Sequence, residues 1–233
     1  MRKDLLGCEY EYFEDTMGDV IYARYRELAI QGREAGFTPL IIIPSDPLIE
    51  LFEELNAQED AAAQRDHALS QAAQADAQAF FRDEQKRLEK ALGKRWMPKT
   101  GDFRFVLPNL KPPLCGMMMP EAEALIVKVP TRNPWEVAVW FPMGGFNDCP
   151  KPVQQAAVFR YWHEKHGAVP VVLQGHNLWI LELTHPPQSD ADCEALAREH
   201  FLFCIDIRPP LGDTIREIAS NLRGATTWGF WWD

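Results

Sequence analysis

The sequence predicts an α+β fold: a mixed or antiparallel sheet with helices packed on it, plus a long helical insertion that projects from the body. Three observations favour this fold. Short apolar runs bounded by Gly, Pro or Asp alternate with segments of helical length. Hydrophobic residues make up 46% of the chain, enough for a packed core. One long stretch, from Leu48 to Leu92, contains neither Gly nor Pro.

The first elements of the chain follow from local patterns. Acidic and aromatic residues alternate over residues 9–19, which predicts a short strand, and residues 20–35 have helical spacing. The apolar run over 38–44 lies between prolines and predicts a buried strand. Ser45 then offers a capping side chain and Pro47 suits a first helical turn, so a helix begins there.

The stretch Leu48–Leu92 is rich in Ala, Gln and charged residues, which are good helix formers. A single helix of this length would span about 68 Å, so the helix must break, fold back or project. Its apolar residues are mostly Ala, with a few larger ones such as Leu69, Phe80 and Phe81. Because this apolar stripe is weak, we expect a solvated arm rather than a central helix.

The second half of the chain gives clearer patterns. Strands are expected over 124–129, 135–141, 169–173, 178–183 and 227–233. Helices are expected over 153–166, 190–203 and 215–222. We therefore expect an acidic α/β part over 1–119, with the helical arm at about 48–92, and an α+β domain over 120–233. The loop-rich stretch between them contains one possible strand, over 103–107.

The net charge of −10 is distributed unevenly. Residues 1–60 contain 14 acidic and 5 basic side chains, a net charge of −9, which leaves −1 for the rest of the chain. Such a region repels nucleic acid and attracts a basic protein surface. The five cysteines form no CxxC pair, which argues against a zinc site or a disulfide framework. No apolar run is long enough for a secretory leader or a membrane helix. We expect a cytoplasmic protein without metal or cofactor.

Several motifs of the second half occur in a characteristic order. They are Val129-Pro130-Thr131, Pro134-Trp135-Glu136-Val137, Gly144-Gly145-Phe146-Asn147-Asp148-Cys149-Pro150, Arg160-Tyr161-Trp162-His163-Glu164-Lys165-His166-Gly167 and Phe230-Trp231-Trp232-Asp233. In these motifs the chain, over about residues 120–233, resembles the bacterial family known as domain of unknown function 4253. The resemblance implies a bacterial cytosolic protein and transfers no catalytic residue. Some members of the family resemble immunity proteins that are paired with secreted antibacterial toxins.

The most enzyme-like feature is Cys149, which precedes the expected helix over 153–166. A Cys at a helix N-terminus can have a lowered pKa and act as a nucleophile. His163 lies at the far end of that helix, about 20 Å away, so only His176 or His200 could serve as its base. In the alternative, structural interpretation, Asp148 caps the helix and Cys149 packs in the core.

Aromatic and polar residues of the same region define a candidate pocket: Trp135, Asn147, Asp148, Cys149, Tyr161 and His163. Trp and Tyr residues at strand and helix spacing are, however, more often core residues. His163 and His166 could share one face of a helix, but the sequence offers no third metal ligand beside them.

The leading functional hypothesis is an immunity or antitoxin-type protein that binds and neutralises a toxin or secreted effector, possibly a nuclease. Acidic residues and two aromatic residues of the arm are the candidate partner-binding set: Glu9, Glu11, Glu14, Asp15, Asp19, Asp60, Asp66, Asp76, Phe80 and Phe81. The alternative is a hydrolase or other enzyme centred on Cys149, Asp148 and a histidine. A housekeeping binding domain is the third possibility.

Overall fold

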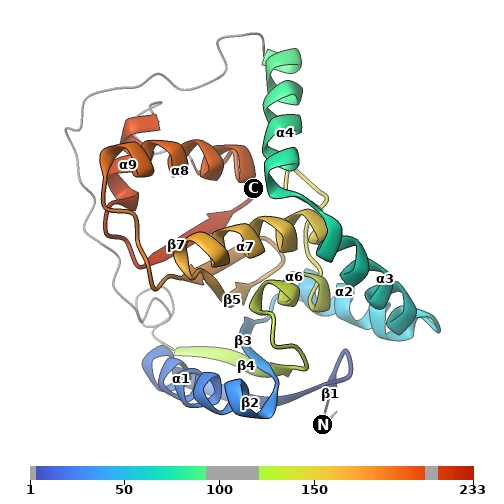
Figure 1. Cartoon of the computed structure of the whole chain (residues 1–233). Coiled ribbons are helices and arrows are strands. Elements are labelled where there is room, and N and C mark those ends of the chain that lie inside the picture. Colours follow the sequence, from blue (N-terminus) through green and yellow to red (C-terminus); the bar gives the residue numbers. More distant parts are fainter. Residues whose placement is uncertain (1–3, 93–120, 208–214) are drawn as a thin grey trace.

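The computed structural model describes residues 4–92, 121–207 and 215–233, and these residues form a mixed α+β fold (Figure 1). Seven strands make one sheet in the order β1-β2-β4-β3-β5-β6-β7. Their bounds are β1 (Asp4–Leu5), β2 (Cys8–Met17), β3 (Thr38–Ile43), β4 (Glu121–Val129), β5 (Val169–Gln174), β6 (Leu178–Glu182) and β7 (Thr227–Trp231). The expected α+β class is confirmed.

Neighbouring strands of this sheet run antiparallel, except that β3 and β5 are parallel. Every residue of β3 is buried, as expected for an apolar central strand. Strand β4 lies between β2 and β3, so strands from residues 1–119 and from residues 120–233 alternate in one sheet. The expected boundary near residue 119 therefore falls between strands of a single sheet.

Helices cover both faces of the sheet (Figure 1). Helix α1 (Gly18–Ala35) buries Ile21, Tyr25 and Leu28 in one core cluster on its own face. A larger cluster on the opposite face holds the other helices together. They are α2 (Asp46–Ala57), α3 (Ala61–Gln74), α4 (Ala77–Leu92), α6 (Val137–Trp140), α7 (Pro152–His166), α8 (Asp190–Phe203) and α9 (Ile215–Leu222).

Trp162 of α7 is fully buried at the centre of the larger core. Its ring stacks on Phe230 of β7 at a centroid distance of 5.2 Å and meets Phe203 of α8 edge-on at 5.1 Å. Trp179 and Trp232 are also fully buried. For these tryptophans the core interpretation of the aromatic residues is confirmed, since packed aromatic pairs stabilise the interior.

The stretch 48–92 is helical, as predicted, but the expectation that all of it forms a solvated arm is wrong. It breaks into α2, α3 and α4, and α3 packs against α6 and α7. The first turns of α4 bury Phe80 and Phe81 in the core, and the far end of α4 stands out beyond its neighbours (Figure 1). Small Ala side chains allow helices to pack closely. The segment is therefore more buried than its few large apolar residues predicted.

The strand expected over 135–141 is also wrong. This segment forms a 3-10 turn, Pro134–Glu136, followed by the short helix α6, which packs on α7. Glu136 fixes the turn, because its carboxylate accepts a hydrogen bond from Thr131 Oγ1 at 2.5 Å and one from Asn133 Nδ2 at 2.9 Å. Val137 to Val139 are buried on all sides in this single turn, which is why their composition suggested a strand.

Candidate functional site

The motif around Cys149 forms a compact turn organised by Gln155, a fully buried residue of α7. Gln155 Nε2 donates hydrogen bonds of 2.7 Å to the carbonyl oxygens of both Met143 and Pro150. Its Oε1 accepts a hydrogen bond of 2.7 Å from Trp179 Nε1. The amide of Gln155 is thus hydrogen-bonded to the turn through its nitrogen and to β6 through its oxygen. Nothing in the sequence indicated this role, because a Gln on a helix is ordinarily exposed.

Gly144 is required at this turn by both its conformation and its surroundings. Its φ is +109°, and a Cβ added there would lie 2.3 Å from the carbonyl oxygen of Pro150 and 2.5 Å from Gln155 Nε2. Only glycine fits such a position. Gly144 therefore has a packing role, whereas Gly145 is favoured by its φ of +81° alone.

Asp148 does not cap α7, contrary to the structural interpretation of the motif. The N-cap of α7 is Lys151, and Gln154 Oε1 accepts a hydrogen bond of 2.9 Å from the backbone N–H of this residue. Asp148 instead pairs with Arg87 of α4, with 2.9 Å between Oδ1 and Nη1. The ion pair thus links this turn to the C-terminal half of α4.

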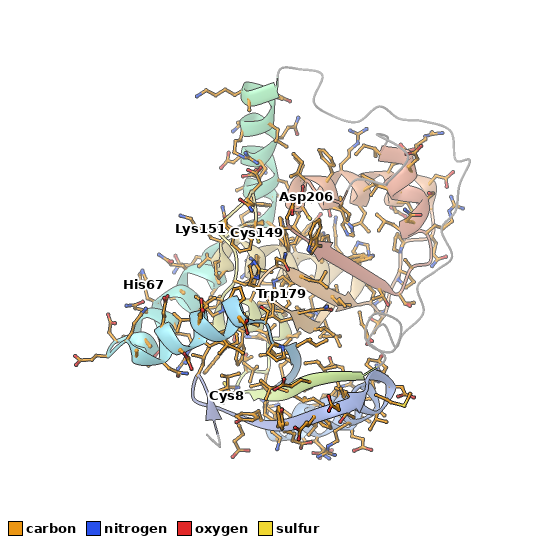
Figure 2. All side chains as sticks on the ribbon, turned by 180° about the vertical axis from the view of Figure 1, so that it is seen from behind. Cys8, His67, Cys149, Lys151, Trp179 and Asp206 are labelled. Carbon is orange, nitrogen blue, oxygen red and sulfur yellow. The ribbon has the colours of Figure 1, made fainter. Side chains whose placement is uncertain are left out.

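Cys149 is buried and lies near the base of α4 (Figure 2). Its Sγ is 3.7 Å from Met143 Sδ and 3.6 Å from Gln155 Nε2. Burial raises the pKa of the Cys149 thiol well above its usual value. A thiol that keeps its proton at neutral pH is a poor nucleophile, so this geometry does not suit covalent catalysis.

The histidines proposed as a base have other surroundings. His200 lies among Trp162, Trp228 and Phe230, and within the described part of the chain neither of its ring nitrogens has a hydrogen-bond partner. His176 contacts the ring of Phe146, at a centroid distance of 5.6 Å.

The residues of the candidate pocket fall into three places rather than one. Trp135 and His163 are in contact at the C-terminal end of α7, with ring centroids 5.2 Å apart. Asn147 lies with Asp148 and Cys149 before its N-terminal end. Tyr161 donates a hydrogen bond of 2.7 Å to Glu199 of α8. The two ends of a 15-residue helix are about 22 Å apart, so these residues do not form one pocket.

The acidic residues of β2 and α1 are partly neutralised by their neighbours. Glu11 accepts hydrogen bonds of 2.7 and 2.8 Å from Arg24, and these lower the pKa of Glu11. Glu9 is 3.8 Å from Lys128 Nζ. The other acids of the candidate partner-binding set here are exposed: Glu14, Asp15 and Asp19.

A second group of acids, the acidic face, follows α2 and the start of α3. Seven exposed carboxylates form it: Asp46, Glu50, Glu53, Glu54, Glu59, Asp60 and Asp66. Within the described part of the chain, none of them makes an ion pair. The one basic side chain over residues 46–66 is Arg65, whose guanidinium lies over the Trp140 ring at 3.8 Å. The field of this face is therefore strongly negative.

An apolar groove, with a volume of about 520 Å³, lies between α3, α6 and the start of α7. Apolar side chains line it: Leu6, Leu55, Ala68, Val139, Trp140, Pro142 and Val153. Gln64, which also lines the groove, donates a hydrogen bond of 2.8 Å to Asp60 of the acidic face. The groove and the acidic face thus adjoin each other.

Phe80 and Phe81 do not belong to a partner-binding surface in this structure. They are 8% and 5% exposed, and their rings lie against Phe203 and Trp162. Asp76, between α3 and α4, is exposed and pairs with Arg82 at 3.5 Å.

No helix within residues 4–92, 121–207 and 215–233 is long and apolar enough to cross a membrane. No group of three or more His, Cys, Asp or Glu residues in these ranges is placed to hold a metal ion.

The structure is a mixed α+β protein in which an acidic face adjoins an apolar groove. Residues 125–233 match the family model described as Domain of unknown function (DUF4253). The matched segment starts within β4 and contains α7, with both Gln155 and Arg160. Comparison with curated proteins and with solved structures gave no match.

Proposed function

We propose that this chain is an immunity-type protein of the bacterial cytoplasm, which binds and neutralises a toxin or secreted effector through protein–protein contacts. The observation that carries the proposal is the acidic face beside the apolar groove. An unneutralised acidic surface speeds association with a basic partner, and an adjoining apolar groove provides the area that makes contact stable.

The chemistry of the acidic face and of the apolar groove indicates what kind of partner would bind there. Apolar side chains of the partner enter the groove, and Lys or Arg residues next to them face the carboxylates of the acidic face. A helix with one apolar side suits a groove of this kind. A nuclease fits the charge pattern, because its substrate groove is basic in order to hold phosphates.

The alternative, a hydrolase centred on Cys149, Asp148 and a histidine, has less support. The Cys149 thiol is buried with a raised pKa, Asp148 is paired with Arg87, and the buried His200 lies among aromatic rings. These three groups have structural surroundings that account for them.

The test is co-expression of the chain with each toxin candidate encoded next to its gene, with growth as the measurement. One variant reverses charge on the acidic face: Glu53→Lys, Glu59→Lys and Asp60→Lys. A second, Ala68→Trp, fills the groove. The matched control makes the same change in charge on another surface: Glu9→Lys, Glu14→Lys and Asp15→Lys.

We expect the parent and the matched control to protect growth. The acidic-face variant should bind the purified toxin at least about tenfold more weakly, and its affinity should depend less on salt. If the acidic-face variant and Ala68→Trp both stay folded and both protect as well as the parent, the proposed surface is wrong. Deletion of residues 57–90 is unsuitable as a test, because it removes core residues Phe80 and Phe81.

A further inference from the structure

A second cavity, of about 480 Å³, lies on the other face of the sheet, beside α1. Among the described helices, α1 alone packs on this face, and it covers β2, β4 and β3. No described helix covers the adjacent ends of β5 and β6 on this face. The cavity is bounded by α1, by the start of β3, by the residues that follow β4 and by the C-terminal end of α7.

This cavity is basic, although the whole chain carries a net charge of −10. Among the described residues of its lining, three carry a guanidinium group, Arg26, Arg33 and Arg132, and one, Glu182, carries a carboxylate. Glu182 already accepts a hydrogen bond from the Tyr22 hydroxyl and lies 3.6 Å from Arg26 Nη1. The positive charge on the remaining two arginines is therefore uncompensated by the lining.

Arg132 is held in place by the C-terminal end of α1. Its Nη1 donates a hydrogen bond of 2.8 Å to the carbonyl oxygen of Arg33, and its Nη2 donates one of 3.4 Å to that of Glu34. In the described part of the chain, no carboxylate lies within 4.0 Å of the guanidinium of Arg33 or Arg132. A guanidinium has five N–H donors, so Arg132 keeps donors for a ligand. A guanidinium can bind an oxyanion in a bidentate manner, so two guanidinium groups in the lining of one cavity suit such a ligand.

The rest of the lining is largely apolar or neutral. Phe37, Pro39, Pro134, Val169 and Leu183 supply apolar surface near the arginines. Neutral polar side chains add a few possible hydrogen bonds, from Thr38, His163 and Thr184. A concave site of about 300–1,000 Å³ with an apolar wall and a few polar groups is typical for a small molecule.

We propose that this cavity binds a small organic anion. Arg33 and Arg132 hold its carboxylate or phosphate group, and Phe37 and Pro134 contact its apolar body. Several of these residues, including Arg132, Pro134 and His163, belong to the segment that matches the family. The site lies on the opposite face of the sheet from the groove, so it is separate from the proposed toxin-binding surface. Either proposal can therefore be wrong without the other.

Phenyl phosphate is the probe, because it joins an oxyanion to a flat apolar ring. Its binding is measured by isothermal titration calorimetry and by the rise in melting temperature of the full chain. Benzyl alcohol, a neutral molecule of similar shape, and sodium chloride at matched ionic strength are the controls for ligand charge. The variant is Arg33→Gln, at an exposed position on α1. The matched control is Arg82→Gln on α4, which changes the net charge equally and lies outside the cavity.

We expect phenyl phosphate to raise the melting temperature in a concentration-dependent way, as a ligand of the native state must. Benzyl alcohol and sodium chloride should not. Arg33→Gln should weaken phenyl phosphate binding by about tenfold or more, since a charge-assisted hydrogen bond is lost, and Arg82→Gln should leave it unchanged. The proposal is overturned if benzyl alcohol binds as well as phenyl phosphate, if neither binds, or if both variants bind like the parent. None of these outcomes affects the growth test of toxin binding.

Discussion

The guanidinium of Arg160 in α7 is hydrogen-bonded to backbone carbonyl groups at the turn between α3 and α4. Its Nη1 donates a hydrogen bond of 2.7 Å to the carbonyl oxygen of Ala73, and its Nη2 donates one of 2.5 Å to that of Ala75. The carbonyl groups at a helix C-terminus have no partner inside the helix, and a cation is favoured there. A residue of the family-matched segment thus fixes the helices that precede it.

Replacing Arg160 with Ala should therefore loosen α3 and α4. We expect Arg160→Ala to lower the free energy of unfolding by about 1–3 kcal/mol, because the hydrogen bonds involve a charged donor. Urea denaturation measures this loss, and hydrogen exchange should rise first in residues 70–85. Arg160→Lys should recover only part of the loss, since one ammonium cannot reach all the carbonyl oxygens. Equal exchange in Arg160→Ala and the parent would contradict the role given to Arg160.

The C-terminal tryptophans offer a matched pair. Trp232 is fully buried and Trp231 is 48% exposed, in agreement with the alternation of side chains along a strand. Trp232→Ala should lower the free energy of unfolding by about 3–5 kcal/mol, the usual loss for a buried aromatic residue. Trp231→Ala should cost less than about 1 kcal/mol. Similar urea midpoints for the two variants would show that the tail does not pack as described.

His200 should make the protein less stable in mild acid. Burial lowers the pKa of His200 well below its usual value, and the pKa of the nearby His166 is lowered in the same direction. Between the lowered pKa and the unfolded value of about 6.5, the unfolded chain binds more protons than the native chain. The free energy of unfolding should therefore fall as the pH drops below about 6.5.

The measurement is urea denaturation at a series of pH values from 8 to 5. His200→Leu removes one of the two groups and should reduce the slope over this range. His67→Leu, at an exposed position of α3, is the control and should keep the parent's slope. A steeper slope in His200→Leu would mean that the acid sensitivity has another origin.

Cys149 should react slowly with thiol reagents in the native protein. Burial raises the pKa of Cys149, and it raises the pKa of Cys204 to about 12. Both thiols are protonated at neutral pH, and only the thiolate attacks iodoacetamide. Mass spectrometry of peptides should show these two cysteines unlabelled at pH 7.5 and labelled in urea. Selective, rapid labelling of native Cys149 would revive the enzyme hypothesis.

Local patterns predicted most of the secondary structure, because their causes are local. Ser45 accepts a hydrogen bond from Leu48 N at the start of α2, and Gly167 ends α7 with a φ of +61°, both as the residue types suggest. The segment Val137–Trp140 was misread because its composition suits a strand, whereas contact with α7 decides its shape. A tertiary contact of this kind cannot be recognised from the residues of a short sequence segment.

The candidate sites were less predictable than the fold. Gln155 and Arg160 determine how the turn and the helices are held, yet each looks like an ordinary helix-surface residue in the sequence. The basic cavity collects Arg33 and Arg132, which are far apart in the chain and come together only because β4 pairs with β3. The acidity of residues 1–60 was visible in the sequence. Which of those carboxylates are neutralised, such as Glu11, depended on partners that only the fold supplies.

The position of β3 has a consequence for the autonomy of the family-matched segment. Within residues 125–233, β4 and β5 are not neighbours, because β3 lies between them and pairs with both. A fragment that begins at residue 120 would contain β4 as an isolated strand and β5, β6 and β7 as a three-stranded sheet. The edges of β4 and β5 that pair with β3 in the full chain would lack their hydrogen-bond partners. Such edges recruit other chains, so the fragment alone should aggregate. In the full chain, residues 38–43 pair with both β4 and β5 and so join the two parts of one sheet.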